Sequence, residues 1–329
     1  CGYTDPIQEF GMDCMDLAYN TACILSEIGM ERSSIVLALV EPFVHWGMLS
    51  MADAERLFGE DVARLLSLVA RLKNKTITLE NMSDAQFSDF VISFVEDIRV
   101  VIYLTVNRRE VMLALDAVED DGEHETLNEE RTRQAALSRL FYAPIAHRLG
   151  FYGIKRDLED LSVKFEHPEE YYKIVGELKQ TREERDQYLQ DFIAPLREKI
   201  EELQIPYEIK WRTKSSNSIY TKMQSKEVGI DGIYDLFALR VILDVPEKLE
   251  KAVCWAIFGV ASSLYVPNML RTKDWVGKPK SSGYESLHTT MLGPDNHWVE
   301  IQIRSKRMDK VAEHGLAAHW IYKGVKGRD

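Results

Sequence analysis

The sequence is poor in cysteine and has none of the patterns in which cysteine becomes structural. Only four occur in 329 residues, Cys1, Cys14, Cys23 and Cys254, and no two of them form a C-x-x-C pair. Four scattered cysteines without such a pair indicate neither a disulfide framework nor a zinc knuckle. We expect reduced thiols, most of them in the core.

Long apolar runs are absent as well. No segment approaches the roughly 20 consecutive apolar residues of a membrane helix, and the first residues do not resemble a secretory signal. We therefore expect a cytoplasmic protein without a membrane partner. Because residue 1 is not Met and the last residues, Lys326 to Asp329, are not typical of a natural end, we also expect a fragment of a longer chain.

Neither of the common glycine-rich phosphate motifs is present. The chain contains no G-x-x-x-x-G-K-[ST] and no G-x-G-x-x-G segment. A P-loop fold and a dinucleotide-binding fold are therefore not expected.

The charge is acidic overall but unevenly distributed. The net charge is −12, yet residues 1–200 hold 22 basic and 37 acidic residues, while residues 201–329 hold 19 and 16. Such a distribution argues against a general nucleic-acid binder and is compatible with a small polyanionic ligand in the second part. Two short basic stretches, Lys210–Lys226 and Arg271–Lys280, are the candidate ligand contacts, with two solvated surfaces as the alternative.

The hydrophobic period changes at Pro206. Up to about residue 200, apolar residues recur at three- and four-residue spacing, which predicts helices. After Pro206 they alternate, as in Leu287, Thr289 and Met291 and again in Val299, Ile301 and Ile303, which predicts half-buried strands. Pro294–Asn296 indicates a turn between the last two strands. The sequence therefore predicts an all-α part followed by an α+β part.

The segment Thr213–Lys226 is a candidate phosphate site. Lys214, Ser218 and Lys222 recur every four residues and would share one face of a helix. Free backbone N–H groups at the start of this helix could bind phosphate, and the lysines would add charge. Asp235 and Glu300 are isolated carboxylates in apolar surroundings, suited either to Mg²⁺ bridging phosphates or to two structural salt bridges.

These residues also carry a family resemblance. The blocks Arg212–Met223, Tyr234–Ile242, Arg271–Asp274, Gly283–Thr290 and Val299–Arg304, followed by Ala312–Trp320, resemble in order the synthetase domain of the RelA/SpoT homologues, the (p)ppGpp enzymes. Upstream, Tyr142–Gly150 and Asp157–Ser162 resemble the long members. The resemblance implies an all-α N-terminal HD-like domain (1–155), a helical connector (156–204) and an α+β nucleotidyltransferase-like synthetase domain with a mixed sheet (205–329).

The resemblance implies transfer of the β,γ-pyrophosphate of ATP to the ribose 3′-hydroxyl of GDP or GTP. The roles it implies are adenine and phosphate binding for Arg212, Lys214, Ser218, Lys222 and Arg240, acceptor binding for Arg271, Lys273, Lys280, Tyr284 and His288, Mg²⁺ binding for Asp235 and Glu300, and general-base catalysis by Glu300 supported by Gln302. Tyr284 would stack on guanine, and it shares a strand face with His288. In this family (p)ppGpp can act as a regulator, whereas the ribosome and tRNA act through C-terminal domains not found in this chain.

The chain departs from the family at two positions of the synthetase motif. Ser282 and Glu285 stand where the family usually has Asn and Gln. Because serine replaces only part of an amide's donor and acceptor pair, we expect altered acceptor affinity rather than lost chemistry.

Larger departures fall in the HD-like domain. Long members hold Mn²⁺ there with a His-Asp pair and hydrolyse the alarmone. Here Glu41 and Pro42 stand at that pair, His45 and Trp46 at a Glu-Asp pair, and Asn107 and Val111 at an aspartate and an asparagine. We expect a regulatory domain without hydrolase activity, and His45 as a packed or surface residue.

Three other functions remain as alternatives. A catalytically inactive sensor of guanine nucleotide or alarmone would have no need for the metal carboxylates. An alarmone hydrolase would need the missing ligands. A nucleotidyltransferase acting on RNA ends would need a basic track for nucleic acid, which the charge does not favour.

Overall fold

The computed structural model describes residues 13–76, 97–118, 125–180, 182–230, 237–280, 283–294 and 297–314. The chain divides into two compact units, residues 1–145 and 146–329. The domain limits expected above, at residues 155 and 204, stay a prediction. None of the described helices combines the length and the apolar composition needed to cross a membrane.

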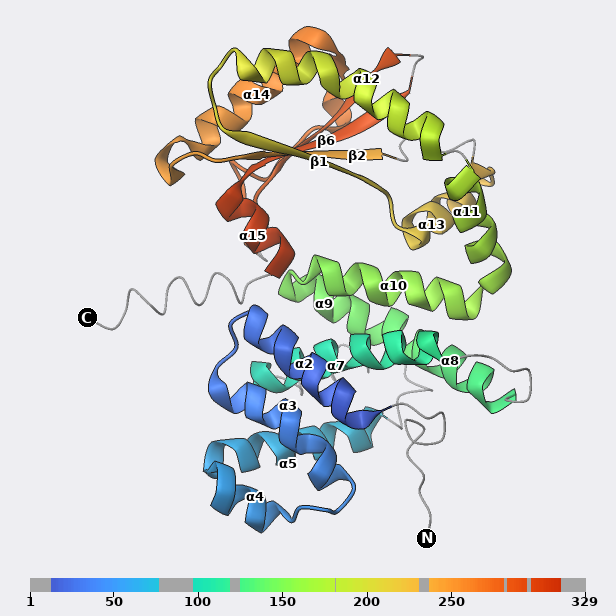
Figure 1. Ribbon diagram of the computed structural model, residues 1–329, viewed down its shortest axis with the longest axis vertical. Helices are drawn as coiled ribbons and strands as arrows, with labels where there is room; N and C mark the ends of the chain where they lie inside the picture. The colour runs from blue at the N-terminus through green and yellow to red at the C-terminus, as the bar shows by residue number, and fades with distance from the viewer. Residues whose placement is uncertain are drawn as a thin grey trace. The chain divides into compact units, whose positions relative to one another are not determined.

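The described part of the first unit is helical (Figure 1). Its elements are α2 (Cys14–Glu27), α3 (Arg32–His45), α4 (Met51–Phe58), α5 (Glu60–Thr76), α7 (Ile98–Ala117), α8 (Glu125–Leu137), the π-helical turn η2 (Ser138–Tyr142) and α9 (Ala143–Leu149), which runs into the second unit. Side-chain caps start several of these helices. Asp13 Oδ1, for example, accepts from the N–H of Met15 at 2.7 Å, and Ser50 Oγ accepts from that of Asp53 at 3.0 Å.

Helix α7 forms the centre of this unit. Its residues 100–106 are all buried, which a one-sided amphipathic helix could not achieve. It packs against α2, α3, α5 and α8. The prediction of a helical first part is confirmed.

The second unit begins with three helices, α10 (Tyr152–Glu166), α11 (Pro168–Gln180) and α12 (Arg182–Glu201). A sheet follows, made of β1 (Tyr207–Thr213), β2 (Phe237–Leu243), β3 (Val266–Pro267), β4 (Lys273–Asp274), β5 (Leu287–Leu292) and β6 (Trp298–Ser305). Between and after the strands lie α13 (Ser216–Lys226), η4 (Glu247–Leu249), α14 (Glu250–Leu264), η5 (Met269–Arg271) and α15 (Lys306–His314).

The sheet is mixed and has the strand order β1-β2-β6-β5-β3, with β4 paired to β5. Only the β2–β6 pair is parallel; the other described pairs are antiparallel. The hairpin predicted around Pro294 joins β5 to β6. The α+β prediction with a mixed sheet is therefore confirmed.

The two faces of the sheet differ in chemistry. Helices α12 and α14 cover one face, and α13 and α15 lie on the other side (Figure 1). The covered face holds the core, in which Leu239, Ile301 and Ile303 meet Phe192 of α12 and Ile257 of α14. Because side chains alternate along a strand, the intervening residues of β2, β5 and β6 point to the opposite face, where the polar side chains collect.

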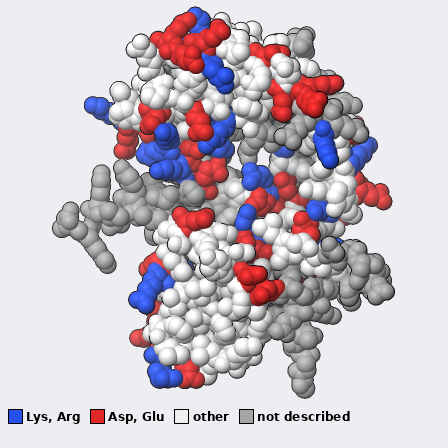
Figure 2. All heavy atoms as spheres, viewed as in Figure 1, with Lys and Arg blue, Asp and Glu red and all other residues white. Residues whose placement is uncertain are grey.

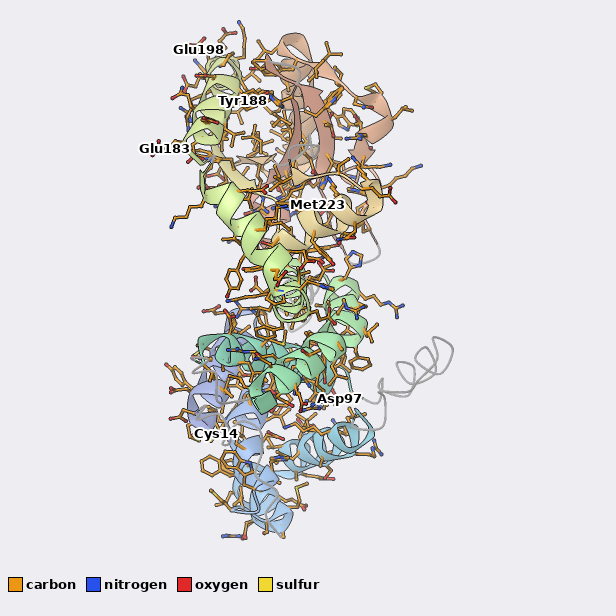
Figure 3. The ribbon with its side chains drawn as sticks, turned by 90° about the vertical axis from the view of Figure 1, so that its right-hand side faces the viewer. Cys14, Asp97, Glu183, Tyr188, Glu198 and Met223 are labelled. Atoms are coloured by element: carbon orange, nitrogen blue, oxygen red, sulfur yellow. The ribbon has the colours of Figure 1, made fainter. Side chains whose placement is uncertain are left out.

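Helix α12 is fixed to the end of the β5–β6 hairpin. Tyr188 faces the sheet, whereas Glu183 and Glu198 point away from it (Figure 3). The Tyr188 hydroxyl donates to the carbonyl of Pro294 at 3.1 Å.

On the face seen in Figure 2, acidic and basic side chains of this unit lie close beside one another instead of forming separate single-sign surfaces.

Candidate active site

The polar face of the sheet is built from three adjacent strands. Arg240 of β2 and His288 of β5 both lie opposite Gln302 of β6 in the register. One step along, Ala238 and Thr290 both lie opposite Glu300. Since β6 is the middle strand of the three, its Glu300, Gln302 and Arg304 form the centre of this face.

Glu300 is the most connected carboxylate of this face. Its Oε2 lies 3.2 Å from Lys214 Nζ, and its Oε1 lies 3.3 Å from His288 Nδ1 and accepts from Gln302 Nε2 at 3.2 Å. Burial by itself would raise the pKa of Glu300, but the hydrogen bond from His288 and the charge of Lys214 outweigh it. The net pKa lies well below the ordinary value, so the group is a carboxylate at neutral pH.

A cavity of about 370 Å³ opens over this face. All of its lining residues belong to the second unit. Nine predicted site residues line it: Lys214, Ser218, Lys222, Arg240, Lys280, Tyr284, His288, Glu300 and Gln302. A second cavity, also of about 370 Å³, shares Lys222, His288 and Glu300 and adds the predicted Arg271 and Lys273.

Neither cavity includes two of the predicted site residues, Asp235 and Arg212. Asp235 lies outside the described residues, and so does Ser282, one of the two departures from the family motif. Arg212 lies in β1, and its side chain is outside the described part of the chain.

The start of α13 differs from the expectation of free backbone N–H groups. The N–H of Asn217 donates to Asp160 Oδ1 at 2.8 Å, and that of Ser218 donates to Ser215 Oγ at 3.3 Å. The prediction that these groups are available to phosphate is wrong, because a carboxylate from α10 and the Ser215 cap already accept from them. The face carrying Lys214, Ser218 and Lys222 nevertheless lines the cavity.

Tyr284 also differs from the expectation of a strand residue. Strand β5 begins only at Leu287, and Tyr284 precedes it in an irregular segment, next to Gly283, which has φ +71° and donates its N–H to the Lys280 carbonyl at 2.8 Å. The prediction that Tyr284 and His288 lie on one face of a strand is therefore wrong, because Tyr284 is not part of the strand. The two side chains still meet, with Tyr284 Oη 2.7 Å from His288 Nε2.

The ring of Tyr284 is enclosed by neighbours. Tyr152 packs edge-on against it at 5.1 Å between centroids, and Lys280 Nζ lies 4.9 Å from its centroid. Burial lowers the pKa of Lys280 and raises that of Tyr284. The departure at Glu285 points elsewhere, since its Oε2 pairs with Arg307 Nη1 at 2.7 Å.

Sequence reasoning missed the contribution of the helices before the sheet. His147, Tyr152, Lys155, Arg156 and Glu159 of α9 and α10 line the same cavity. In the sequence, the segment Asp157–Ser162 shows only a likeness to long family members. The adjacent basic pair Lys155 and Arg156 was the available signal, but nothing in its spacing showed which surface it would face.

Comparisons with known proteins match the two parts of the chain to two different family models. A model described as "Region found in RelA / SpoT proteins" matches residues 211–327, and one described as "HD domain" matches residues 7–152. The fold and these two matches define a protein with an HD domain followed by a synthetase domain of the RelA/SpoT type. The chain belongs to the RelA/SpoT family.

Several curated relatives match along nearly the whole chain. The bifunctional (p)ppGpp synthase/hydrolase SpoT of Escherichia coli K12 is 34% identical over 92% of this chain and 41% of its own length. A GTP pyrophosphokinase of Myxococcus xanthus is 33% identical over 93% of this chain and 39% of its own length. The chain thus spans about two fifths of the length of these relatives.

A third relative carries the name of a hydrolase. It is the guanosine-3′,5′-bis(diphosphate) 3′-pyrophosphohydrolase of Aquifex aeolicus, 32% identical over 93% of this chain and 42% of its own length. Among solved structures, small alarmone synthetase 2 of Bacillus subtilis is 25% identical over 47% of this chain and 82% of that chain. Its TM-score of 0.32 is too low for the likeness to support an argument.

Proposed function

We propose that the second unit synthesises (p)ppGpp by transferring the β,γ-pyrophosphate of ATP to the 3′-hydroxyl of GDP or GTP. The observation that carries this proposal is that two groups of predicted nucleotide contacts meet around Glu300, most of them in one cavity and Arg271 and Lys273 in a second cavity that shares Glu300. The names of the relatives, a (p)ppGpp synthase/hydrolase and a GTP pyrophosphokinase, point to the same reaction.

ATP would bind on the side of α13 and β2. Lys214, Ser218 and Lys222 would hold its phosphates, and the planar guanidinium groups of Arg212 and Arg240 would hold adenine between them. Arg240 Nη1 now lies 2.8 Å from Glu313 Oε1 and 3.3 Å from Asp309 Oδ1, which keeps its guanidinium at the cavity wall.

The acceptor nucleotide would bind on the side of β4 and β5. Tyr284 would stack on guanine, while Arg271, Lys273, Lys280 and His288 would neutralise its phosphates and orient its ribose. Without such cations two polyanions would repel each other in one cavity.

In the chemical step the 3′-oxygen attacks the β-phosphorus of ATP. The bond from that phosphorus to the α,β-bridging oxygen breaks, AMP leaves, and Glu300 takes the proton of the hydroxyl. Lys214 lowers the pKa of Glu300, so its movement towards the ATP phosphates would make Glu300 a stronger base. Gln302 Nε2 holds the carboxylate in place.

The ionised, half-buried carboxylate of Glu300 fits a hard divalent cation, which prefers oxygen ligands. Glu300 and Asp235 would hold Mg²⁺, with phosphate and water oxygens as its other ligands. When bound, the ion would neutralise charge on the transferred phosphates.

The test is an incubation of the chain with ATP, Mg²⁺ and GDP or GTP, followed by chromatography of the nucleotides. We expect equal amounts of AMP and of tetraphosphate or pentaphosphate. Binding of both nucleotides without AMP release, in the intact chain and in a chain lacking residues 1–200, would refute the synthetase and favour the sensor.

We further propose that the first unit does not hydrolyse the alarmone, although several relatives are named hydrolases. Glu41, at the position of the metal-binding pair, lies in the interior with its Oε1 2.6 Å from Lys73 Nζ and its Oε2 3.2 Å from the Tyr103 hydroxyl. An ammonium group so close competes with a metal ion for the carboxylate. The residues at this position therefore do not fit Mn²⁺.

The other replaced positions are equally unsuited to a metal. The side-chain nitrogen of Asn107 lies 3.5 Å from Thr21 Oγ1, and Val111 is an apolar core residue. His45 is exposed. We expect ppGpp to survive incubation with the chain and Mn²⁺, and release of pyrophosphate above a protein-free control would refute this proposal.

A further inference from the structure

Arg304 is the largest fully buried side chain in the described part of the protein. It is 1% exposed, yet it lines the cavity as part of its floor. It follows Glu300 and Gln302 on the same face of β6, one step further from the phosphate-binding lysines. None of the roles proposed so far uses it.

The charge of Arg304 is compensated, but its hydrogen-bonding capacity is not. Asp309 Oδ1 lies 2.6 Å from Nη2, and Glu313 Oε1 lies 3.8 Å from it. Nevertheless, neither Nη2 nor Nε makes a hydrogen bond of acceptable geometry to the described residues. A buried guanidinium with two unmet donors is costly unless a further partner satisfies them.

The two unmet donors lie on one edge of the guanidinium. The N–H groups of Nε and Nη2 run nearly parallel, which suits two neighbouring acceptors on a planar partner. Guanine presents such a pair in O6 and N7, whereas adenine presents an acceptor at N7 beside a donor at N6. The edge therefore matches guanine and opposes adenine.

Arg304 is also close to the residue expected to stack on guanine. Its Cζ lies 6.0 Å from the centroid of the Tyr284 ring. Ala312 and Glu313 of α15 line the cavity beside them. A base stacked at Tyr284 would lie beside the Arg304 side chain, and because Nε and Nη2 are buried, it would reach their edge by displacing the side chains that cover it.

We propose that Arg304 determines specificity for the acceptor by donating from Nε and Nη2 to N7 and O6 of guanine. This inference rests on the proposed function. It assigns selection of the acceptor base to a residue of β6 and leaves the phosphates and the chemical step to the residues named above.

The experiment compares four acceptors with ATP and Mg²⁺. They are GDP, 7-deaza-GDP, which lacks N7, the 5′-diphosphate of 2-aminopurine riboside, which lacks O6, and IDP, which keeps both acceptors and lacks only the 2-amino group. For the unaltered chain we expect kcat/KM to be about 10- to 100-fold lower for each of the first two analogues than for GDP.

In Arg304→Met, kcat/KM for GDP should fall to the values for 7-deaza-GDP and the 2-aminopurine diphosphate, so that GDP is no longer preferred over them. The ratio of kcat/KM for IDP to that for GDP should stay unchanged. Arg304→Lys keeps the charge beside Asp309 but has no parallel pair of donors, and it tests the same point if the methionine variant does not fold. Arg307→Lys is the matched control. Arg307 pairs with Glu250 and Glu285 and does not line the cavity, so this variant should keep the preference for GDP.

An equal fall for all four acceptors in Arg304→Met and Arg304→Lys would show a purely structural role and overturn the inference. Failure of the unaltered chain to release AMP with any acceptor would instead refute the proposed function. Equilibrium binding of the same four nucleotides measures the same preferences without turnover, so Arg304 is tested in either case.

Discussion

Two of the glutamate–lysine pairs, Glu41 with Lys73 in the first unit and Glu300 with Lys214 in the second, differ in their surroundings. In the first unit Glu41 is 7% exposed, lies 2.6 Å from Lys73, and accepts from Tyr103, a fully buried phenol whose pKa is raised by burial and by the nearby carboxylate. In the second unit Glu300 lies 3.2 Å from Lys214 at a cavity that several further cations line.

The two pairs differ in the charged and polar groups that surround the carboxylate once it has paired with its lysine. Glu41 is closed off by its own neighbours, since α3, α5 and α7 supply the carboxylate, the ammonium and the phenol. Around Glu300 the positive charge exceeds what one carboxylate neutralises, and polyanions are the natural complement. A glutamate–lysine pair is thus enclosed in the interior of one unit and lies at the wall of a cation-lined cavity in the other.

The largest expected effect separates the two glutamates by activity. Glu300→Gln should lower AMP release from ATP and GDP by about 1,000-fold or more, because an amide can neither accept the proton nor hold a cation in the same way. Glu208→Gln is the control, a change on β1 at a half-exposed carboxylate that pairs with Lys210. A Glu300→Gln variant with more than a tenth of the original rate would contradict the role of Glu300.

The second prediction separates the units by thiol chemistry. Burial, aided by Glu250, Glu285 and Asp274, raises the pKa of Cys254 to about 12 from an ordinary 9.0. At pH 8 its thiolate fraction should be about 1,000-fold lower than that of a solvated cysteine. Peptide mapping after treatment with a maleimide should therefore find the half-buried Cys23 labelled and Cys254 unlabelled until the second unit unfolds. Equal labelling of the two at low urea would contradict the buried position of Cys254.

The third prediction tests whether the pair in the first unit is structural. Lys73→Met leaves a carboxylate in the interior with one partner fewer, and we expect a loss of about 2 kcal/mol in the free energy of unfolding, measured with urea. The double variant Glu41→Leu, Lys73→Met should recover most of that loss, because it removes both charges. Lys199→Met, at an exposed pair with Glu202, serves as control and should cost far less. A double variant with a lower free energy of unfolding than Lys73→Met would contradict the view that the loss comes from the carboxylate left with one partner fewer.

The smallest expected effect concerns acid. The hydrogen bond from Arg99 outweighs partial burial and lowers the pKa of Asp61 to about 2 from 3.8. The ionised form is therefore favoured in the folded state, so its stabilising contribution is complete above about pH 5 and is lost as the pH falls through 3.8 towards 2. Urea midpoints of the unaltered chain and Asp61→Asn should differ most at pH 6 and converge as the pH falls towards 2. A constant difference would show that Asp61 does not act through its charge.

Periodicity was sufficient for the fold. The change from helical spacing to alternation at Pro206 predicted the strands around Leu287 and Val299, and the turn at Pro294 predicted the β5–β6 hairpin. The same alternation implied that Glu300, Gln302 and Arg304 share a face, as the structure shows. Such predictions hold because they depend only on neighbours within one element.

Contacts between elements could not be predicted from the sequence in the same way. The caps on α13 come partly from Asp160, 57 residues away, and the ring against Tyr284 belongs to Tyr152, 132 residues away. A local pattern carries no information about such partners, so the sequence alone does not reveal the acceptors of the backbone N–H groups at Asn217 and Ser218. The pairing of Glu285 with Arg307 was equally hidden, because the two are separated by β5 and β6.

The position of β6 has a consequence for how the protein is made. It is the last described strand to leave the ribosome, yet it lies in the middle of the sheet and joins β2 to β5. Until residues 298–305 have been synthesised, the two outer parts of the sheet have no common neighbour, and the long-range parallel pairing with β2 must wait for them. The cavity over the polar face can therefore form only after β6 has been synthesised. Until then the lysines and arginines of the growing chain that line this cavity in the folded protein are not yet arranged around it.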